Sequence, residues 1–184
     1  GEGKIIVKAC SACNGEGRLQ SDDTVSIKIP AGVSNGMQLS LREGGNAGIR
    51  GGDAGNLLIL IEEEEHESFH REGDNIIYEL FINFADAALG KSVEVPTLNG
   101  KARFKIDPGT QSGKIVRLKG KGIPSINNYG FVGDQLVHIN VWTPKQLTNE
   151  EKNLLEKLRN MKNFDPNPGK SEKGFFDKMK EFFS

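Results

Sequence analysis

The feature that most constrains the fold of this chain is an internal duplication. Residues 28–45, KIPAGVSNGMQLSLREGG, align with residues 105–122, KIDPGTQSGKIVRLKGKG, and a second block at Gly55 aligns with one at Gly133 after a shift of one residue. The identical positions in the first block are Lys28/Lys105, Ile29/Ile106, Gly32/Gly109, Gly36/Gly113, Leu41/Leu118 and Gly45/Gly122. This self-similarity predicts two related β-units in tandem, each with strand, glycine-bracketed turn, strand, glycine-rich loop and strand.

Hydrophobic alternation in the first unit has the period of a half-buried strand. Val25 and Ile27 alternate with polar residues, and so do Leu39 and Leu41. Because side chains two residues apart lie on one face of a strand, we expect an antiparallel strand over 24–29 and another around the two leucines. A small sheet of this kind has an uncovered apolar face and an edge strand, which favours docking of an extended peptide by strand addition.

The second unit adds further strands. The sequences IIYELFINF (76–84) and KSVEVPTL (91–98) have strand composition, and a short Ala-rich stretch separates them. Asn99-Gly100 follows and leads into KARFKI. This dipeptide supplies the positive φ angles of a type I′ turn, so we expect a hairpin centred on Asn99 and Gly100.

The pattern changes to helix near residue 146. Thr148 and Glu151 form a capping box, and Asp165-Pro166 ends the helix. Its predicted apolar face consists of Leu154, Leu155, Leu158 and Met161. A second apolar stripe on a short terminal helix consists of Phe175, Phe176, Met179, Phe182 and Phe183. This stripe is too apolar to remain in water, so it either packs on its own chain or forms a seam with a second chain.

Charge excludes some classes of partner. The 24 basic and 25 acidic residues give a net charge of −1, which predicts neither nucleic acid nor a membrane as a partner. No signal peptide and no apolar run of membrane-spanning length occurs in the sequence. We therefore expect a soluble, cytoplasmic protein.

The two cysteines have the spacing of one zinc knuckle. Cys10 and Cys13 lie in ACSACNGEG, where the following glycines let backbone amides approach the sulfur atoms. A structural zinc site needs four ligands, and the only other candidates in this chain are three His residues without knuckle spacing. Either the partners of the knuckle lie outside this chain, or a complete site forms within it.

A second metal-like pattern is His66-Glu67-Ser68-Phe69-His70, which matches the H-E-x-x-H motif of zinc proteases. That motif requires a helix to place both imidazoles on one face. The apolar and acidic run before it predicts a strand, and Arg71 to Asp74 predicts a turn, so we expect a loop with a buried Phe69. A zinc metalloprotease using His66, Glu67 and His70 remains the alternative function.

Several stretches together resemble the carboxy-terminal half of the bacterial DnaJ family of type I J-domain co-chaperones. In chain order they are CSACNGEG, SIKIPAGVSNG, HESFHREGDN, ADAALGKSVEVPTLNGK, PGTQSGK, LKGKGIP and TPKQLTNEEK. The resemblance covers essentially the whole chain. It implies a fragment that starts within the zinc-binding region and lacks the J-domain, so that Cys10 and Cys13 supply half of a zinc site completed only in the full-length protein, with no zinc bound in the fragment.

The resemblance also implies a mainly β fold with two tandem β-sandwich-like peptide-binding domains and a dimerisation helix. The expected parts are 1–17, a remnant of the Cys-rich domain; 18–70, an incomplete client-binding domain I; 71–145, client-binding domain II; and 146–184, the dimerisation helix and tail. The implied dimerisation residues are Leu154, Leu155, Leu158, Phe175, Phe176, Phe182 and Phe183.

The function that the resemblance implies is not enzymatic. Unfolded polypeptides would bind a groove in the first domain, at positions matching Val25, Ile27, Leu39, Leu41 and Phe69. A homodimer would protect these clients from aggregation and, in the full protein, deliver them to the seventy-kilodalton, DnaK-type chaperone. A purely structural assembly module is a further alternative.

Overall fold

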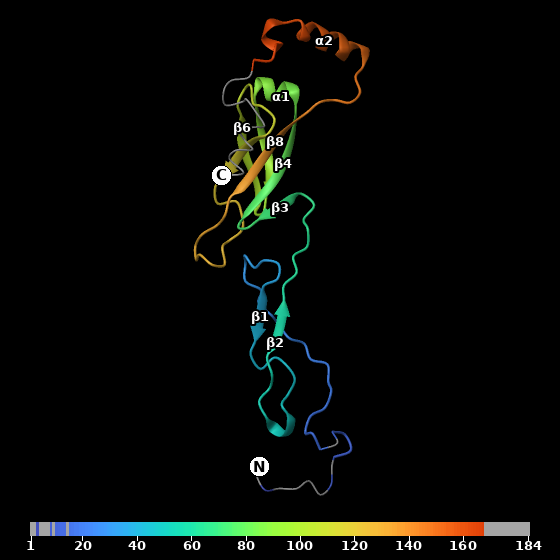
Figure 1. Cartoon of the computed structure of the whole chain (residues 1–184), viewed down its shortest axis with the longest axis vertical. Helices are drawn as coiled ribbons and strands as arrows, with labels where there is room; N and C mark the ends of the chain where they lie inside the picture. The colour runs from blue at the N-terminus through green and yellow to red at the C-terminus, as the bar shows by residue number, and fades with distance from the viewer. Residues whose placement is uncertain (1–2, 4–7, 9, 14, 168–184) are drawn as a thin grey trace. The chain divides into compact units, whose positions relative to one another are not determined.

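The computed structural model of the chain describes residues 3, 8, 10–13 and 15–167 (Figure 1). The chain divides into two compact units, Gly1–Trp142 and Thr143–Ser184. Strands dominate the first unit, which confirms the mainly β fold. Its elements are β1 (Gln38–Leu41), η1 (Ile49–Gly51), β2 (Leu57–Leu60), β3 (Phe69–Glu72), β4 (Asn75–Asn83), α1 (Phe84–Leu89), β5 (Lys91–Thr97), β6 (Gly100–Ile106), β7 (Lys114–Leu118) and β8 (Gln135–Trp142). The second unit holds α2 (Asn149–Arg159) and the 3₁₀ turn η2 (Lys162–Phe164).

The four-stranded sheet has the strand order β3-β4-β8-β7. β8 pairs in parallel with β4 and antiparallel with β7, while β3 and β4 pair as an antiparallel hairpin. Every second residue of β8 points to the same face of the sheet. On that face Gln135 and Val137 are fully buried and Ile139 is 1% exposed, so β8 forms the centre of the sheet.

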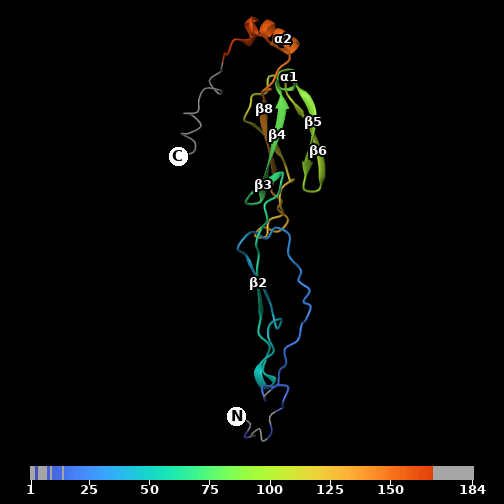
Figure 2. The same cartoon turned by 90° about the vertical axis from the view of Figure 1, so that its right-hand side faces the viewer.

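The core lies between this sheet and the two-stranded sheet β5-β6, which Figure 2 shows beside it. The core residues are Ile82, Ala87, Ile106 and Ile139, with Val93 and Phe104 packed against them. Asn83 starts α1 because its side-chain oxygen accepts the Asp86 amide at 2.7 Å, which satisfies one free N–H of the first turn.

The hairpin between β5 and β6 differs by one residue from the predicted one. Leu98 and Asn99 form the turn, and Gly100 is already the first residue of β6, opposite Thr97. Gly100 has a φ of 124°, but Asn99 does not adopt a positive φ. Because a type I′ turn requires positive φ at both central residues, the prediction of that turn at Asn99-Gly100 is wrong.

The duplicated sequences fold into the same strand pair. β1 pairs antiparallel with β2, and β7 pairs antiparallel with β8. Leu39 lies opposite Ile59, and at the aligned positions Val116 lies opposite Val137. Residues that are aligned in the two copies therefore occupy the same places in the two strand pairs, including the shift of one residue between the blocks. The predicted tandem strand pairs are confirmed.

The loop between the two strands is closed by matching hydrogen bonds in both copies. In the first copy the Gly45 amide donates to the Gly55 carbonyl at 2.8 Å, and in the second the Gly122 amide donates to the Gly133 carbonyl at 2.9 Å. These glycines are aligned pairs in the sequence. The repeated glycines thus mark a repeated loop geometry rather than a phosphate-binding loop.

A side chain anchors each loop at an aligned backbone position. The Asn56 Oδ1 accepts the Glu43 amide at 3.2 Å, and the Asp134 Oδ1 accepts the Gly120 amide at 2.7 Å. Glu43 and Gly120 both have left-handed backbones, with φ values of 56° and 65°. The repeat therefore needs a left-handed backbone at this position. Gly120 adopts this conformation without strain in the second copy, whereas the conformation is unfavourable for Glu43 in the first copy.

Residues 24–29 do not form the predicted strand. Val25 and Ile27 are 38% and 40% exposed, and no strand in the described part of the chain pairs with the segment. The aligned residues in the second copy do form a strand, β6, because β5 pairs with it. Alternation indicates which side chains favour a buried face, but a strand also needs a neighbour for its backbone N–H and C=O groups.

The second unit starts with the predicted capping box. The Thr148 Oγ1 accepts the Glu151 amide at 3.3 Å, and the Glu151 carboxylate accepts the Thr148 amide at 2.7 Å. The helix ends at Arg159 with Asn160 as its C-cap, so Met161 lies beyond the helix and the predicted extent is too long. Among the helices that the structure describes, none is long and apolar enough to cross a membrane. The phenylalanine stripe at 175–183 lies outside the described residues.

Candidate functional site

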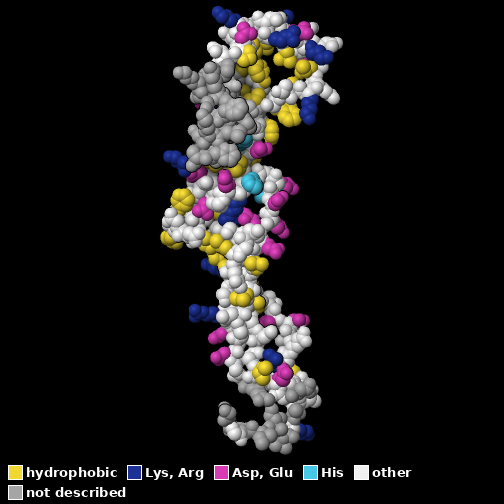
Figure 3. Space-filling view, viewed as in Figure 1, with side chains coloured by type: hydrophobic (Ala, Val, Ile, Leu, Met, Phe, Trp, Pro, Cys, Tyr) yellow, Lys and Arg dark blue, Asp and Glu magenta, His cyan; other side chains and the backbone are white. Residues whose placement is uncertain are grey.

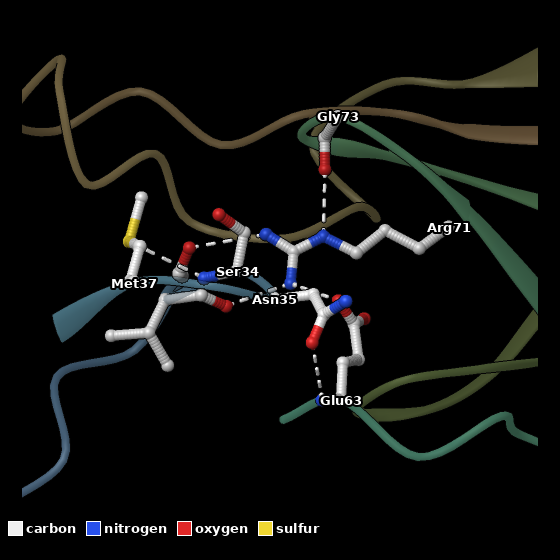
Figure 4. Close-up of polar contacts among 8 residues, drawn as sticks. Ser34, Asn35, Met37, Glu63, Arg71 and Gly73 are labelled. Carbon is white, nitrogen blue, oxygen red and sulfur yellow. Dashed lines mark hydrogen bonds and ion pairs between the residues drawn. The ribbon is translucent and has the colours of Figure 1, made fainter. Parts of the chain in front are cut away.

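A single arginine, Arg71 of β3, joins the first copy of the repeat to the β3–β4 hairpin, which pairs with β8 of the second copy (Figure 4). The Arg71 guanidinium donates to the carbonyl oxygens of Val33 at 2.8 Å, Gly32 at 3.1 Å and Gly73 at 2.9 Å, and it lies 3.2 Å from the Glu63 carboxylate. The five N–H donors of a guanidinium suit such a set of acceptors in one plane. Sequence reasoning did not identify Arg71, because three of its acceptors are backbone carbonyls that carry no sequence signal.

The turn that Arg71 holds also packs closely against the second copy. Gly32 has a φ of 92°, and a Cβ atom at this position would overlap the Pro124 carbonyl oxygen. The glycine therefore meets two requirements, a left-handed backbone and a close approach of two chain segments. These contacts fix the start of β1 relative to the β3–β4 hairpin.

The pair β1–β2 has one half-buried face and one exposed face. Leu39 and Leu41, both predicted peptide-binding residues, are half-buried on the same face of β1. On β2 the side chains of Leu58 and Leu60 are 61% and 64% exposed. β2 pairs only with β1 among the described strands, so its other edge is unpaired. The exposed face carries Leu58 and Leu60 opposite Ser40 and Gln38, so the pair presents two exposed leucines beside the free edge of β2.

Sequence reasoning missed Leu58 and Leu60, although a signal was present. The run LLIL in β2 is apolar at every position rather than at alternate positions. Such a run is typical of a strand covered on both faces. The described residues cover one face of β2 only in part and leave the other exposed, so they do not provide the cover on both faces that this run predicts.

The other predicted peptide-binding residues lie in different surroundings. Val25 and Ile27 are partly exposed in the irregular segment before β1. Phe69 lies in β3, where its ring packs at 5.0 Å from the His66 ring and 5.8 Å from the Tyr78 ring, measured between centroids. Phe69 therefore belongs to the four-stranded sheet, and the structure does not place it in the same sheet as Leu39 and Leu41.

Cys10 lies directly before a turn over residues 11–13 and Cys13 lies within it, and both thiols are free. The backbone amides of Ala12 and Cys13 donate to the Cys10 sulfur and lower the pKa of its thiol, and the Cys13 side chain contributes in the same direction. A lowered thiol pKa favours the thiolate that binds zinc. The two residues thus fit half of a tetrahedral site. No cluster of three or more His, Cys, Asp or Glu suited to a metal occurs in the described ranges.

The H-E-x-x-H match does not form a protease site. His66 lies before β3, where its Nδ1 accepts the amides of Ser68 at 3.0 Å and Phe69 at 3.3 Å. His70 lies within β3, so the segment is a turn followed by a strand instead of a helix. The motif requires both imidazoles on one helical face, and the structure therefore gives no support to the metalloprotease alternative.

These features define a class of protein: a β-rich module built by internal duplication, with an exposed apolar strand and one Cys-x-x-Cys pair that could supply half of a zinc site. The chain belongs to the DnaJ family, because the family model described as "DnaJ C terminal domain" matches residues 6–144. This is not an enzyme family, which supports a non-enzymatic role.

Curated bacterial relatives agree with this assignment. The chain is 48% identical over 183 residues to the Chaperone protein DnaJ of Salinibacter ruber, covering 98% of this chain and 47% of the relative. It is 50% identical over 174 residues to that of Bacteroides thetaiotaomicron, covering 95% and 43%. It is 44% identical over 187 residues to that of Chlorobium limicola, covering 100% and 46%. The chain thus spans about half the length of the curated relatives that it matches.

Proposed function

We propose that this chain is the client-binding part of a DnaJ-type co-chaperone. It binds exposed apolar segments of unfolded proteins and slows their aggregation, and in the longer protein it passes them to a DnaK-type chaperone. The observation that carries the proposal is that one edge of β2 has no neighbouring strand among the described residues and that Leu58 and Leu60 of the same strand are exposed. An extended segment could add to this edge through backbone hydrogen bonds and place its apolar side chains on the leucines.

The proposed binding surface extends over the residues that the family resemblance implies. They are Val25, Ile27, Leu39, Leu41 and Phe69, and we add Leu58 and Leu60. Leu39 and Leu41 lie on the other, half-buried face of the pair, opposite Ile59 and Leu57 of β2. They support the first copy of the repeat as the main site because a strand added to β2 would direct alternate side chains toward each face. Client-binding domains over 18–70 and 71–145, each of β-sandwich type, are part of this proposal.

Two further parts of the proposal concern metal and assembly. In the longer protein Cys10 and Cys13 would hold zinc together with two further ligands, and a reducing, cytoplasmic location would keep these thiols available. The exposed Leu154 and Leu155 of α2, at 54% and 39%, support a homodimer formed through this helix and the tail. Leu158, Phe175, Phe176, Phe182 and Phe183 complete the proposed dimerisation set.

Peptide binding tests the function directly. A fluorescein-labelled apolar peptide should raise its anisotropy on addition of the chain, and the double variant Leu58→Ser, Leu60→Ser should weaken this binding by about tenfold or more. The matched control is Leu89→Ser with Ile115→Ser, two side chains that are 78% and 58% exposed on α1 and β7. Equal weakening by both variants, or no binding by the unmodified chain, would contradict the proposal.

A further inference from the structure

A second apolar surface in the first unit is a cavity of about 1020 Å³ beside β3 and β4. The apolar side chains that line it are Phe69, Ile76, Ile77, Leu98 and Ile123. They come from β3, β4, the β5–β6 turn and the loop before β8, which are well separated along the chain. The apolar lining therefore lies on both faces of the sheet, with Phe69 and Ile76 on one face and Ile77 on the other, and it is separate from the β2 surface of the first copy.

A turn held by His66 leaves part of the β4 edge free beside this cavity. Because the His66 Nδ1 accepts the amides of Ser68 and Phe69, the chain bends away at the start of β3. The pairing of β3 with β4 ends at Phe69, the first residue of β3, which lies opposite Tyr78. β4 continues beyond this point, and among the described strands none pairs with that part of its edge. Glu79, the next residue of β4, lines the cavity.

The rim of the cavity carries negative charge that the described residues compensate only in part. Figure 3 shows acidic side chains gathered along the segment that connects β2 to β3. The carboxylates that line the cavity are Glu63, Glu64, Glu65, Glu67 and Glu79. Of these only Glu63 forms an ion pair with a described residue, namely Arg71 at 3.2 Å. An apolar lining beside four carboxylates that pair with no described cation complements a ligand that is both apolar and cationic.

We propose that this cavity binds extended client segments in which Lys or Arg flanks an apolar core. The inference rests on the proposed function and adds a charge preference to it. The backbone of the segment would pair with the free edge of β4, and its alternate apolar side chains would lie toward Phe69 on one face of the sheet and toward Ile77 on the other. The flanking cations would lie near Glu64, Glu65 and Glu67. The carboxylates thus select among apolar segments by charge.

The test compares two labelled peptides with the same apolar core, one flanked by Lys and one by Ser. At about 50 mM salt the Lys-flanked peptide should bind about fivefold more tightly, and at about 500 mM the two should differ by less than about twofold, because salt screens exposed charges. The variant Glu64→Gln, Glu65→Gln, Glu67→Gln should lose the preference at low salt and keep its affinity for the Ser-flanked peptide. The matched control Asp22→Asn, Asp53→Asn, Glu156→Gln removes as much charge elsewhere and should keep the preference.

The possible results distinguish failure of the charge preference from failure of the proposed client-binding function. Equal binding of both peptides by the unmodified chain, or a full preference in the glutamine variant, would overturn the charge selection and leave the proposed function standing. Loss of the preference in the control variant would also overturn it, because net charge would then account for the effect. If neither peptide binds the unmodified chain, the proposed function fails and the charge preference fails with it.

Discussion

The Arg71 guanidinium donates a hydrogen bond to the Val33 carbonyl oxygen at 2.8 Å, although 38 residues separate the two in sequence. This bond joins the β3–β4 hairpin, which pairs with β8 of the second copy, to the turn that precedes β1 in the first copy. The side chain of Arg71 is only 18% exposed, so its partners are shielded from competing water. Arg71 therefore links the proposed β2 binding surface to the folded core of the second copy.

Removing this link should destabilise the chain measurably. Arg71→Met leaves the carbonyls of Gly32, Val33 and Gly73 without their donor, which should lower the free energy of unfolding by about 1–3 kcal/mol. Arg71→Lys should recover only part of this loss because an ammonium cannot reach several acceptors in one plane. Urea unfolding followed by circular dichroism measures the effect.

The control is Arg103→Met, since Arg103 is 74% exposed and makes one contact of 3.5 Å with Glu94. Its effect should stay below about 0.5 kcal/mol. Equal midpoints for Arg71→Met and the unmodified chain would show that the link between the copies contributes nothing to stability.

The left-handed position of the repeat predicts opposite effects in the two copies. Glu43→Gly should stabilise the chain by about 0.5–1 kcal/mol, because glycine adopts the φ of 56° without strain. Gly120→Ala should destabilise the chain by about 1 kcal/mol. The cause would be backbone strain and not a steric clash, because a Cβ atom there would meet no atom within 4 Å. Thermal unfolding of both variants checks the signs, and the same sign for both would contradict this assignment.

The aligned residues Asp134 and Asn56 predict a pH dependence. The Gly120 amide, then Arg117 and Lys119, lower the pKa of Asp134 below its ordinary value. A carboxyl whose pKa is lower in the folded state stabilises the fold above its unfolded pKa, near 4, and loses this contribution as pH falls through the folded pKa. Stability should therefore fall more steeply below pH ~4 in the unmodified chain than in Asp134→Asn.

The asparagine variant is a fair comparison because Asn56 already accepts the aligned amide in the first copy. Asp134→Asn should thus keep the loop hydrogen bond and lose the ion pair with Arg117. Urea unfolding midpoints measured between pH ~3 and ~7 test whether Asp134 causes the pH dependence. If the midpoints of the two proteins change in parallel with pH, Asp134 is excluded as the titrating group.

The sequence was informative where local chemistry decides the structure. Aligned glycines predicted the strand pairs to the residue, and the Thr148–Glu151 spacing predicted the start of α2. It was misleading at 24–29, where alternation could not reveal that no described strand lies alongside. The role of Arg71 could not be predicted from the sequence, because two of its acceptors are backbone carbonyls 38 and 39 residues away along the chain. The exposed face of β2 could have been suspected from LLIL, but only the structure showed that nothing described covers it.

The proposed dimer makes its own prediction about α2. Leu154→Glu with Leu155→Glu should shift the chain from dimer to monomer, because each change puts a charge on a surface that association would bury. Asn153→Glu, on the same helix, is the matched control and should leave the mass unchanged. Sedimentation equilibrium measures the mass, and a dimer that persists in the double variant would remove these leucines from the interface.

Amide hydrogen exchange of β2 in the presence of an unfolded client tests the central claim most directly. If extended segments add to the free edge of this strand, amides in Leu57–Leu60 should exchange about tenfold more slowly when a permanently unfolded protein is bound. The edge strand β7, which is not part of the proposed surface, provides the internal reference and should show little change. Unchanged exchange in β2 under conditions where the client is demonstrably bound would contradict the account.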